Sequence, residues 1–198
     1  MARPAPIATN LEFAAFLEQE VHARERHEFV DGHLFVTPGG TTCHNKLAGR
    51  FFAQILPVAE SQACDVFFTD ILVKTPDDTG YYPDVFVVCD QSDTHPRVKC
   101  RPCLIVEVLS KSTEAIDRGE KLRRYCSIPS LETCIMLDQR EARAEIYSRQ
   151  ADGSWRYSTF EGDAMLPLPP LQLEVSLAAL YANLPAETDS SMIEPNLD

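Results

Sequence analysis

The stretches YPDVFVVCD (residues 82–90) and PCLIVEVLSKSTEAIDRGEKLRRY (residues 102–125) decide the fold of this chain. Each contains a short apolar run rich in β-branched residues, which is typical of a buried strand. Each run also carries one carboxylate, Asp84 in the first and Glu107 in the second. Burying a carboxylate is costly unless it has a partner, so the two acids predict a cation, a metal or a strong hydrogen-bond donor beside them.

Helices and strands are expected on both sides of this stretch. The pair Asp31-Gly32 joins two alternating runs, which predicts a β-hairpin with a type I′ turn. Helices are predicted over residues 11–23, 41–60, 113–128 and 176–184, and strands over residues 64–75, 82–90, 103–110, 131–138, 141–149 and, as one or two edge strands, 155–175. The expected N-caps are Thr9 or Asn10 for the first helix and Ser112 or Thr113 for the third, and the second helix is expected to start at Thr41 or Thr42. This order predicts an α/β (α+β) fold, a mixed β-sheet flanked by helices and preceded by an N-terminal helix and hairpin.

The chain has the length of one domain with a full hydrophobic core. A single domain is predicted over residues 10–184 of the 198. Residues 1–9 are rich in proline and alanine, and residues 185–198 are acidic, so both ends are expected to be disordered. No apolar run approaches the length of a membrane span, and the N-terminus lacks the apolar core of a secretory signal, so a cytoplasmic protein without membrane contact is expected.

The formal net charge of −12 argues against a protein that coats nucleic acid non-specifically, because neutralising phosphates requires basic surface. Residues 97–124 are different, since they hold eight Lys or Arg against four acids. Any single one of these charges is better explained by an ordinary solvated helix face, while the local excess as a whole keeps a phosphate-bearing substrate possible.

The seven cysteines are scattered, and Cys64, Cys89, Cys126 and Cys134 stand in apolar surroundings. This placement predicts reduced, buried thiols in a reducing compartment. Cys100 and Cys103 form a CxxC pair, which leaves a zinc site or a thiol-redox role as an alternative. A zinc site would need a second pair of ligands, and a redox pair is expected at the start of a helix, whereas this pair leads into a strand.

Two acids at neighbouring strand ends are suited to one reaction in particular. They can hold a hard divalent cation such as Mg²⁺ through oxygen ligands, with water in the other positions. Such a cation generates hydroxide and offsets the charge that builds on a phosphate, and a nearby lysine can stabilise the same transition state. Asp84 and Glu107 therefore predict phosphodiester hydrolysis.

The succession PDV, then a strand ending in EVLS, then ST…D…K…Y resembles the Uma-two family, which is grouped with the restriction endonucleases in the PD-(D/E)xK nuclease superfamily. HEFVDGH resembles the family's upstream acid-containing hairpin, and Cys43-His44 falls where its second helix begins. The resemblance covers roughly residues 10–180. It implies a restriction-endonuclease-like fold, cleavage of DNA with Mg²⁺, for which Mn²⁺ can substitute, and a homodimer.

The superfamily pattern places a lysine two residues after the second acid, where this chain has Leu109. The resemblance therefore implies a migrated lysine, supplied by the following helix. Asp117, Lys121 and Tyr125 are spaced i, i+4 and i+8, so they share one helix face. Lys121 is the predicted catalytic lysine, and Lys111 is the second candidate.

The hypothesis gives each site residue a role beside a simpler alternative. Asp84, Glu107 and the Val108 carbonyl would hold the metal, Lys121 would activate water or stabilise charge, and the supporting residues would be Glu28, His44, Asp117 and Tyr125. In the simpler interpretation Asp84 caps the end of a strand, and Asp117 and Lys121 form a surface ion pair. His44 then only caps its helix, and Tyr125 is a core residue. The alternative function is a non-catalytic binding or regulatory module on the same fold, and the distance between the Lys121 ammonium and the two carboxylates discriminates between them.

Overall fold

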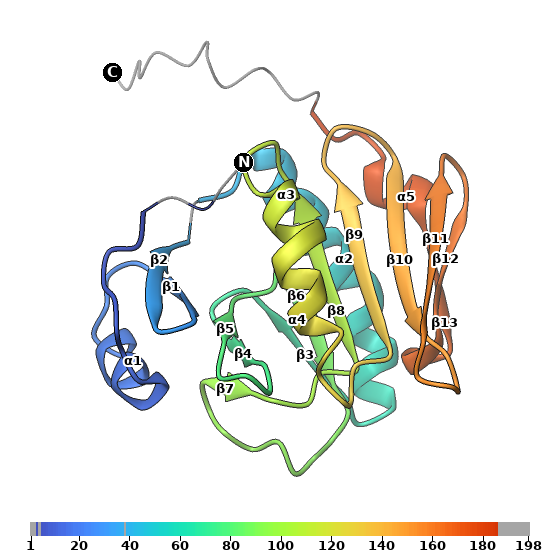
Figure 1. Cartoon of the computed structure of the whole chain (residues 1–198). Helices are drawn as coiled ribbons and strands as arrows, with labels where there is room; N and C mark the ends of the chain where they lie inside the picture. The colour runs from blue at the N-terminus through green and yellow to red at the C-terminus, as the bar shows by residue number, and fades with distance from the viewer. Residues whose placement is uncertain (1–2, 4, 38, 186–198) are drawn as a thin grey trace.

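A six-stranded mixed sheet forms the centre of the computed structural model, which describes residues 3, 5–37 and 39–185 (Figure 1). Its strand order is β11-β10-β9-β8-β6-β3. The strands are β3 (Asp65–Phe68), β6 (Val85–Val88), β8 (Leu104–Leu109), β9 (Thr133–Asp138), β10 (Arg143–Arg149) and β11 (Trp155–Glu161). Only the pair β8 and β9 is parallel in this sheet, and the helix that connects these two strands crosses one face of it.

A second sheet lies beside the first and holds the N-terminal hairpin. Its order is β2-β1-β5-β4-β7. The strands are β1 (His27–Val30), β2 (His33–Val36), β4 (Leu72–Lys74), β5 (Gly80–Tyr81) and β7 (Val98–Lys99), and helix α1 (Phe13–Glu20) packs on them. Phe16 of α1 stacks on Phe29 of β1 with ring centroids 5.1 Å apart. At the other end of the chain lie β12 (Met165–Leu168), a 3₁₀ turn (Pro169–Leu171), β13 (Leu173–Ser176) and α5 (Leu177–Tyr181).

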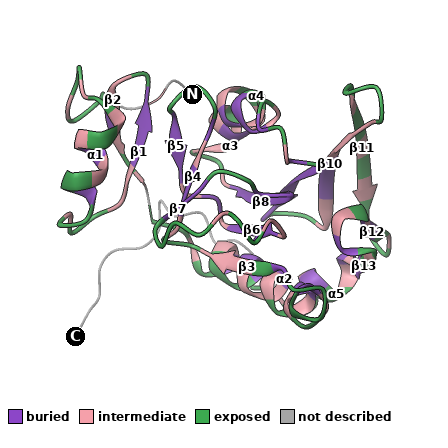
Figure 2. Cartoon of the chain, turned by 90° about the horizontal axis from the view of Figure 1, so that it is seen from below, coloured by how far each residue is buried: buried purple, intermediate pink, exposed green. Residues whose placement is uncertain are grey.

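Two helices cover opposite faces of the six-stranded sheet (Figure 2). Helix α2 (Thr42–Ser61) packs on Leu104, Val106 and Val108 of β8. The other helix consists of α3 (Glu114–Ile116), a π turn η1 (Asp117–Lys121) and α4 (Leu122–Tyr125). Ile105 and Leu109 of β8 face this second helix and pack in one cluster with Tyr125 of α4. Since side chains alternate along a strand, Glu107 must face the same side as Ile105 and Leu109.

The predicted fold class is confirmed, and so is the order of elements. The hairpin turns at Asp31 and Gly32, which have φ of 49° and 80° as a type I′ turn requires. Thr41 caps α2, because its side chain accepts a hydrogen bond from the His44 amide at 3.2 Å. Among the described residues, no helix has both the length and the apolar character needed to cross a bilayer.

Several boundaries differ from the prediction. The segment 64–75 forms two strands, because Thr69 and Asp70 turn the chain with left-handed φ of 58° and 56°. Segment 155–175 forms the three strands β11, β12 and β13 rather than one or two. Helix α1 begins after Glu12 without a side-chain cap, since Asn10 adopts a left-handed φ of 58° before it. Thr113 precedes α3 without a capping side-chain bond.

The N-terminal segment, predicted to be disordered, runs along the hairpin in its described part. The Ile7 amide donates to the Leu34 carbonyl at 2.9 Å, and the Leu34 amide donates to the Ala8 carbonyl at 3.0 Å. This pairing extends the edge of the second sheet beyond β2. The predicted acidic tail lies outside the described residues from 186 onward, so the domain boundaries stay a prediction.

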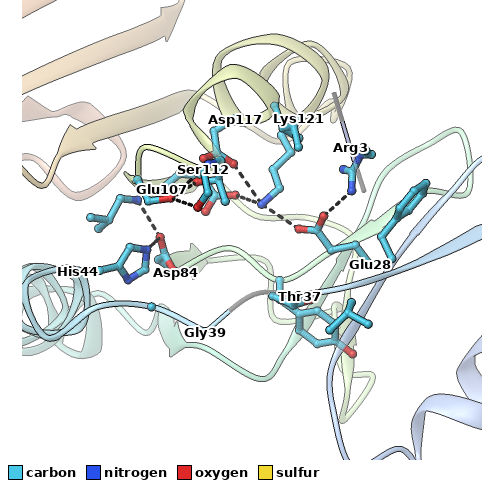
Figure 3. A pocket seen from close by; sticks show the side chains of 18 of the residues that line it. Arg3, Glu28, Thr37, Gly39, His44, Asp84, Glu107, Ser112, Asp117 and Lys121 are labelled. Atoms are coloured by element: carbon cyan, nitrogen blue, oxygen red, sulfur yellow. Dashed lines mark hydrogen bonds and ion pairs between the residues drawn. The ribbon is translucent and has the colours of Figure 1, made fainter. Parts of the chain in front are cut away.

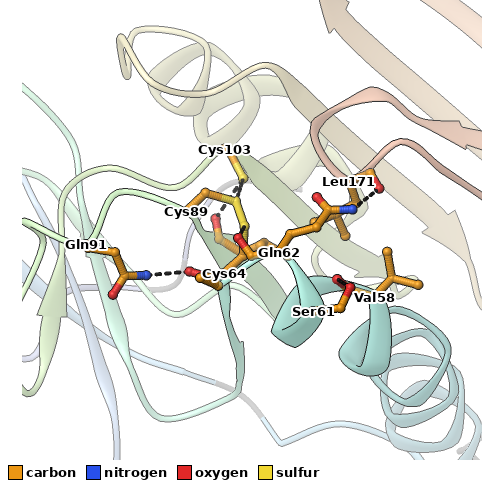
Figure 4. The surroundings of a disulfide bond; sticks show 10 residues. Val58, Ser61, Gln62, Cys64, Cys89, Gln91, Cys103 and Leu171 are labelled. Atoms are coloured by element: carbon orange, nitrogen blue, oxygen red, sulfur yellow. Dashed lines mark hydrogen bonds between the residues drawn. A yellow bond between two sulfur atoms is a disulfide. The ribbon is translucent and has the colours of Figure 1, made fainter.

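The prediction of reduced thiols is wrong for two of the cysteines, because Cys64 and Cys89 form a disulfide (Figure 4). The reason is the register of two strands. Asp65 of β3 pairs with Val88 of β6 in antiparallel fashion, so the next pair along the ladder is Cys64 and Cys89. Cys103 is free and buried, with its sulfur 3.5 Å from that of Cys89, while Cys100 is exposed. The CxxC pair is therefore not a disulfide.

Candidate active site

The predicted site residues meet at a cavity of about 310 Å³ between the hairpin, the start of α2 and the helix that contains the π turn. Seven of the eight line it: Glu28, His44, Asp84, Glu107, Val108, Asp117 and Lys121. Tyr125 is fully buried behind Glu107. Lys111, the second candidate for the lysine, is exposed and does not line the cavity.

Lys121 lies at the centre of the cavity wall and contacts three carboxylates (Figure 3). Its ammonium lies 2.8 Å from Glu28 Oε1, 3.3 Å from Glu107 Oε1 and 3.3 Å from Asp117 Oδ1. Burial alone would lower the pKa of Lys121, but the three acids outweigh burial and raise the pKa well above its ordinary value. The three acids therefore favour the charged form of Lys121.

Glu107 projects from the middle of β8 into this acidic cluster. Burial raises the pKa of Glu107, and the negative charges of Asp84 and Asp117 raise it further. The positive charge of Lys121 lowers it but does not outweigh these effects. Tyr125 donates a hydrogen bond to Glu107 Oε1 at 2.7 Å and so fixes the carboxylate in one orientation. The strand alternation and the helix that returns over it bring Glu107, Lys121 and Tyr125 together.

Asp84 directly precedes β6 and is fixed from two sides. The Val108 amide donates to Asp84 Oδ2 at 2.7 Å, and His44 Nε2 lies 3.2 Å from the same oxygen. Burial would lower the pKa of His44, but its contact with Asp84 outweighs burial and raises the pKa. Gly40 is needed here, because a Cβ on it would come within 2.8 Å of His44 Nδ1.

Sequence reasoning missed Arg3. Its guanidinium pairs with Glu28 Oε2 at 2.9 Å and with Glu120 Oε2 at 3.1 Å, and it lies 4.8 Å from the centroid of the Phe35 ring. Glu28 is therefore held between Arg3 on one oxygen and Lys121 on the other. Residues 7 and 8 of the same N-terminal segment pair with β2, and no local pattern in the sequence predicts that pairing.

The donor set fits a hard cation. Four acids (Glu28, Asp84, Glu107 and Asp117) line the cavity together with the cations Lys121 and Arg3. Carboxylate and carbonyl oxygens are the ligands that Mg²⁺ prefers. Within the described part of the chain, no three His, Cys, Asp or Glu residues form a ready-made cage. Asp84, Glu107 and the Val108 carbonyl could thus hold Mg²⁺ only with water or substrate oxygens in the remaining positions.

Comparison with known proteins gives matches over most of the chain. The Uma2 family model, described as "Putative restriction endonuclease", matches residues 13–180. Two relatives come from Synechocystis sp. (strain ATCC 27184 / PCC 6803 / Kazusa). "Uncharacterized protein slr1290" is 30% identical over 171 residues, which cover 85% of this chain and 90% of that protein. "Uncharacterized protein sll1609" is 29% identical over 158 residues, which cover 77% and 89%.

One solved structure supports the fold. The crystal structure of a "putative nuclease belonging to DUF820" from Anabaena variabilis ATCC 29413 superposes with a TM-score of 0.68 at 16% identity, over 90% of this chain and 98% of that one. At this identity the likeness concerns the fold alone, and it confirms a nuclease-like architecture. Because the family model spans residues 13–180 and the slr1290 protein matches over 90% of its length, the chain belongs to the Uma2 family of putative restriction endonucleases.

Proposed function

We propose that this protein is an endonuclease that uses Mg²⁺, or Mn²⁺ in its place, to hydrolyse phosphodiester bonds in DNA. One observation carries the proposal. The Lys121 ammonium contacts Glu107 at 3.3 Å in a cavity that Asp84 also lines, so a cation and two candidate metal ligands share one cavity. Family membership supports action on a nucleic acid.

Asp84 and Glu107 would hold the metal, with the Val108 carbonyl as a third oxygen. The bound ion would supply a nucleophile at neutral pH and offset charge on the phosphate. The chain's own groups prepare the two acids for this role. Tyr125 orients Glu107, while the Val108 amide and His44 orient Asp84. Fixed ligands need little rearrangement when a cation arrives.

Lys121 would act as a fixed positive charge. Because its pKa is raised, it would donate hydrogen bonds to phosphate oxygens rather than accept a proton from water. Glu28 and Asp117 hold its ammonium at the cavity wall, and Arg3 in turn holds Glu28. The supporting residues predicted from the sequence thus position the lysine and the metal ligands.

The test is calorimetric titration of Mg²⁺ and Mn²⁺ into the wild type and the Asp84→Ala/Glu107→Ala variant, with DNA cleavage assayed on the same samples. We expect metal binding and cleavage in the wild type and neither in the variant. Asp163→Ala/Glu174→Ala is the matched control, because it removes two exposed acids away from the cavity.

The outcomes separate the two functions. Metal binding by the wild type without cleavage of any nucleic acid would favour a binding or regulatory module, and absence of metal binding would contradict the nuclease proposal. A homodimer is proposed from the family resemblance, and light scattering coupled to size-exclusion chromatography tests it directly.

A further inference from the structure

Two further cavities adjoin the active-site cavity and extend it along the molecule. A cavity of about 200 Å³ shares Thr37, Gly40, His44, Tyr82 and Asp84 with the first. A third cavity, of about 320 Å³, shares Arg26, Asp70 and Tyr82 with the second. We call the second and third cavities together the side groove. The side groove leads from Asp84 past Tyr82 to Arg97.

Tyr82 lines all three cavities, and its ring is held in place. Its hydroxyl donates to Glu20 Oε1 at 3.0 Å, and Glu20 Oε2 lies 2.8 Å from His27 Nδ1. The Arg26 guanidinium lies over the Tyr82 ring, 6.0 Å from its centroid. The side groove therefore holds an aromatic ring and a cation together, the two kinds of group that bind unpaired bases, and a base that stacks on Tyr82 takes the place of Arg26 over the ring.

The arginines of the side groove are free to meet a phosphate. Arg26 pairs with Asp70 at 3.3 Å, but the side chains are 38% and 70% exposed, so this contact holds Arg26 only weakly. Arg97 lines the far end and makes no side-chain ion pair with any residue in the described ranges. A phosphate could therefore engage both arginines without the loss of a buried contact.

The charge of the side groove argues for one strand rather than two. Binding a duplex requires neutralisation of many phosphates on both strands, whereas this groove offers Arg26 and Arg97 against the three acids Glu20, Asp70 and Asp84. The groove therefore has two cations to offer to phosphates and no surplus of positive charge beyond them. In addition, a base inside a duplex has its faces covered by its neighbours, so it could not stack on Tyr82.

We infer that the side groove binds an unpaired nucleic-acid strand on one side of the phosphate that is cleaved. One base stacks on Tyr82, and the adjoining phosphates lie beside Arg26 and Arg97. The inference rests on the proposed function, because it takes the cavity with Asp84 and Glu107 as the place of cleavage. It adds the substrate class, which is single-stranded nucleic acid.

Binding is tested by fluorescence anisotropy with a labelled single-stranded oligodeoxynucleotide and with the same strand annealed to its complement, in EDTA so that no cleavage occurs. We expect the wild type to prefer the single strand. Tyr82→Ala should weaken its binding at least about fivefold, the low end for loss of one base–aromatic stack, and Tyr82→Phe should retain most of it. Arg26→Ala should also weaken binding, and it tests the groove if Tyr82→Ala does not fold.

Arg24→Ala is the matched control, since it removes an exposed charge two residues from Arg26 and outside all three cavities. Equal losses in Arg24→Ala and Arg26→Ala, tighter binding of the duplex, or no binding of either substrate would overturn the inference.

A cleavage assay on two substrates distinguishes failure of the inference from failure of the proposed function. With Mg²⁺ or Mn²⁺, Arg26→Ala should raise KM for the oligonucleotide more than for bis(p-nitrophenyl) phosphate, which reaches only the active-site cavity. Equal increases in the two KM values would overturn the inference. If the wild type cleaves neither substrate while Arg26→Ala still weakens single-strand binding, the proposed function fails and the binding groove stands.

Discussion

Replacement of Lys121 by methionine should destabilise the protein in a way that depends on pH. Methionine keeps the unbranched apolar part of the side chain and removes the ammonium group with its charge. The Lys121 ammonium contacts Glu28, Glu107 and Asp117, and the side chains of all four residues are at most 10% exposed. Removal of one partner from a buried ion pair costs about 3–5 kcal/mol, because the other charge is left uncompensated.

The variant can reduce this cost if one of the three acids binds a proton that it does not carry in the wild type. Burial then raises the pKa of that acid in the folded state above its unfolded value of about 4. Between the two pKa values the folded state binds more protons than the unfolded state, so stability falls as pH rises, by about 1.4 kcal/mol per pH unit. The loss relative to the wild type should thus be about 1 kcal/mol near pH 5 and about 4 kcal/mol near pH 7.

Urea unfolding followed by circular dichroism in EDTA measures this difference at each pH. Lys111→Met is the control, because Lys111 is exposed, and its effect should stay within about 0.5 kcal/mol at both pH values. A loss in Lys121→Met that is the same near pH 5 and pH 7 would refute the reasoning, because the acids would then not be taking up a proton.

Three further predictions concern stability. Cys64→Ser/Cys89→Ser should lower the free energy of unfolding by about 3.5 kcal/mol, because a disulfide across a sequence separation of 25 residues reduces the entropy of the unfolded chain. Dithiothreitol should destabilise the wild type but not this variant. Gly119→Ala should raise the thermal midpoint, with a gain of up to about 1 kcal/mol, because a Cβ there meets no atom within 4 Å and alanine favours helix; a lower midpoint would contradict this. Tyr125→Phe should cost about 1–3 kcal/mol in urea unfolding, because buried Glu107 Oε1 loses a hydrogen-bond donor; an unchanged free energy would show that the bond contributes nothing.

The contacts that follow from local periodicity could be predicted from the sequence. Alternation along β8 puts Glu107 on the same side as Leu109, and the spacing of Asp117 and Lys121 predicts their contact, found at 3.3 Å. The Asp31-Gly32 turn fixes the register of the hairpin and hence which face of β1 carries Glu28. Each of these inferences needs only neighbouring residues, because the side-chain period of a strand or helix is a local property.

Contacts that depend on how distant segments pair could not be predicted. The Cys64–Cys89 disulfide follows from the register of β3 against β6, which the cysteine spacing does not contain. Arg3 contacts Glu28, and residues 7 and 8 pair with Leu34; neither contact follows from local spacing. His44 could be placed at the start of α2, but its contact with Asp84 depends on how that helix crosses the sheet.

The π turn at Asp117–Lys121 has a consequence for how this site can be gained or lost. A π turn closes its hydrogen bond over one more residue than an α turn does, and such turns are frequent at functional sites. Deleting one residue from within it would let the turn close as an α turn, and the spacing of Asp117 and Lys121 would fall from four residues to three. The contacts of Lys121 would then change although no residue in contact with the three carboxylates had been substituted. Insertions and deletions are therefore a second class of genetic change to which this cluster is sensitive, and a library limited to point substitutions would not sample them.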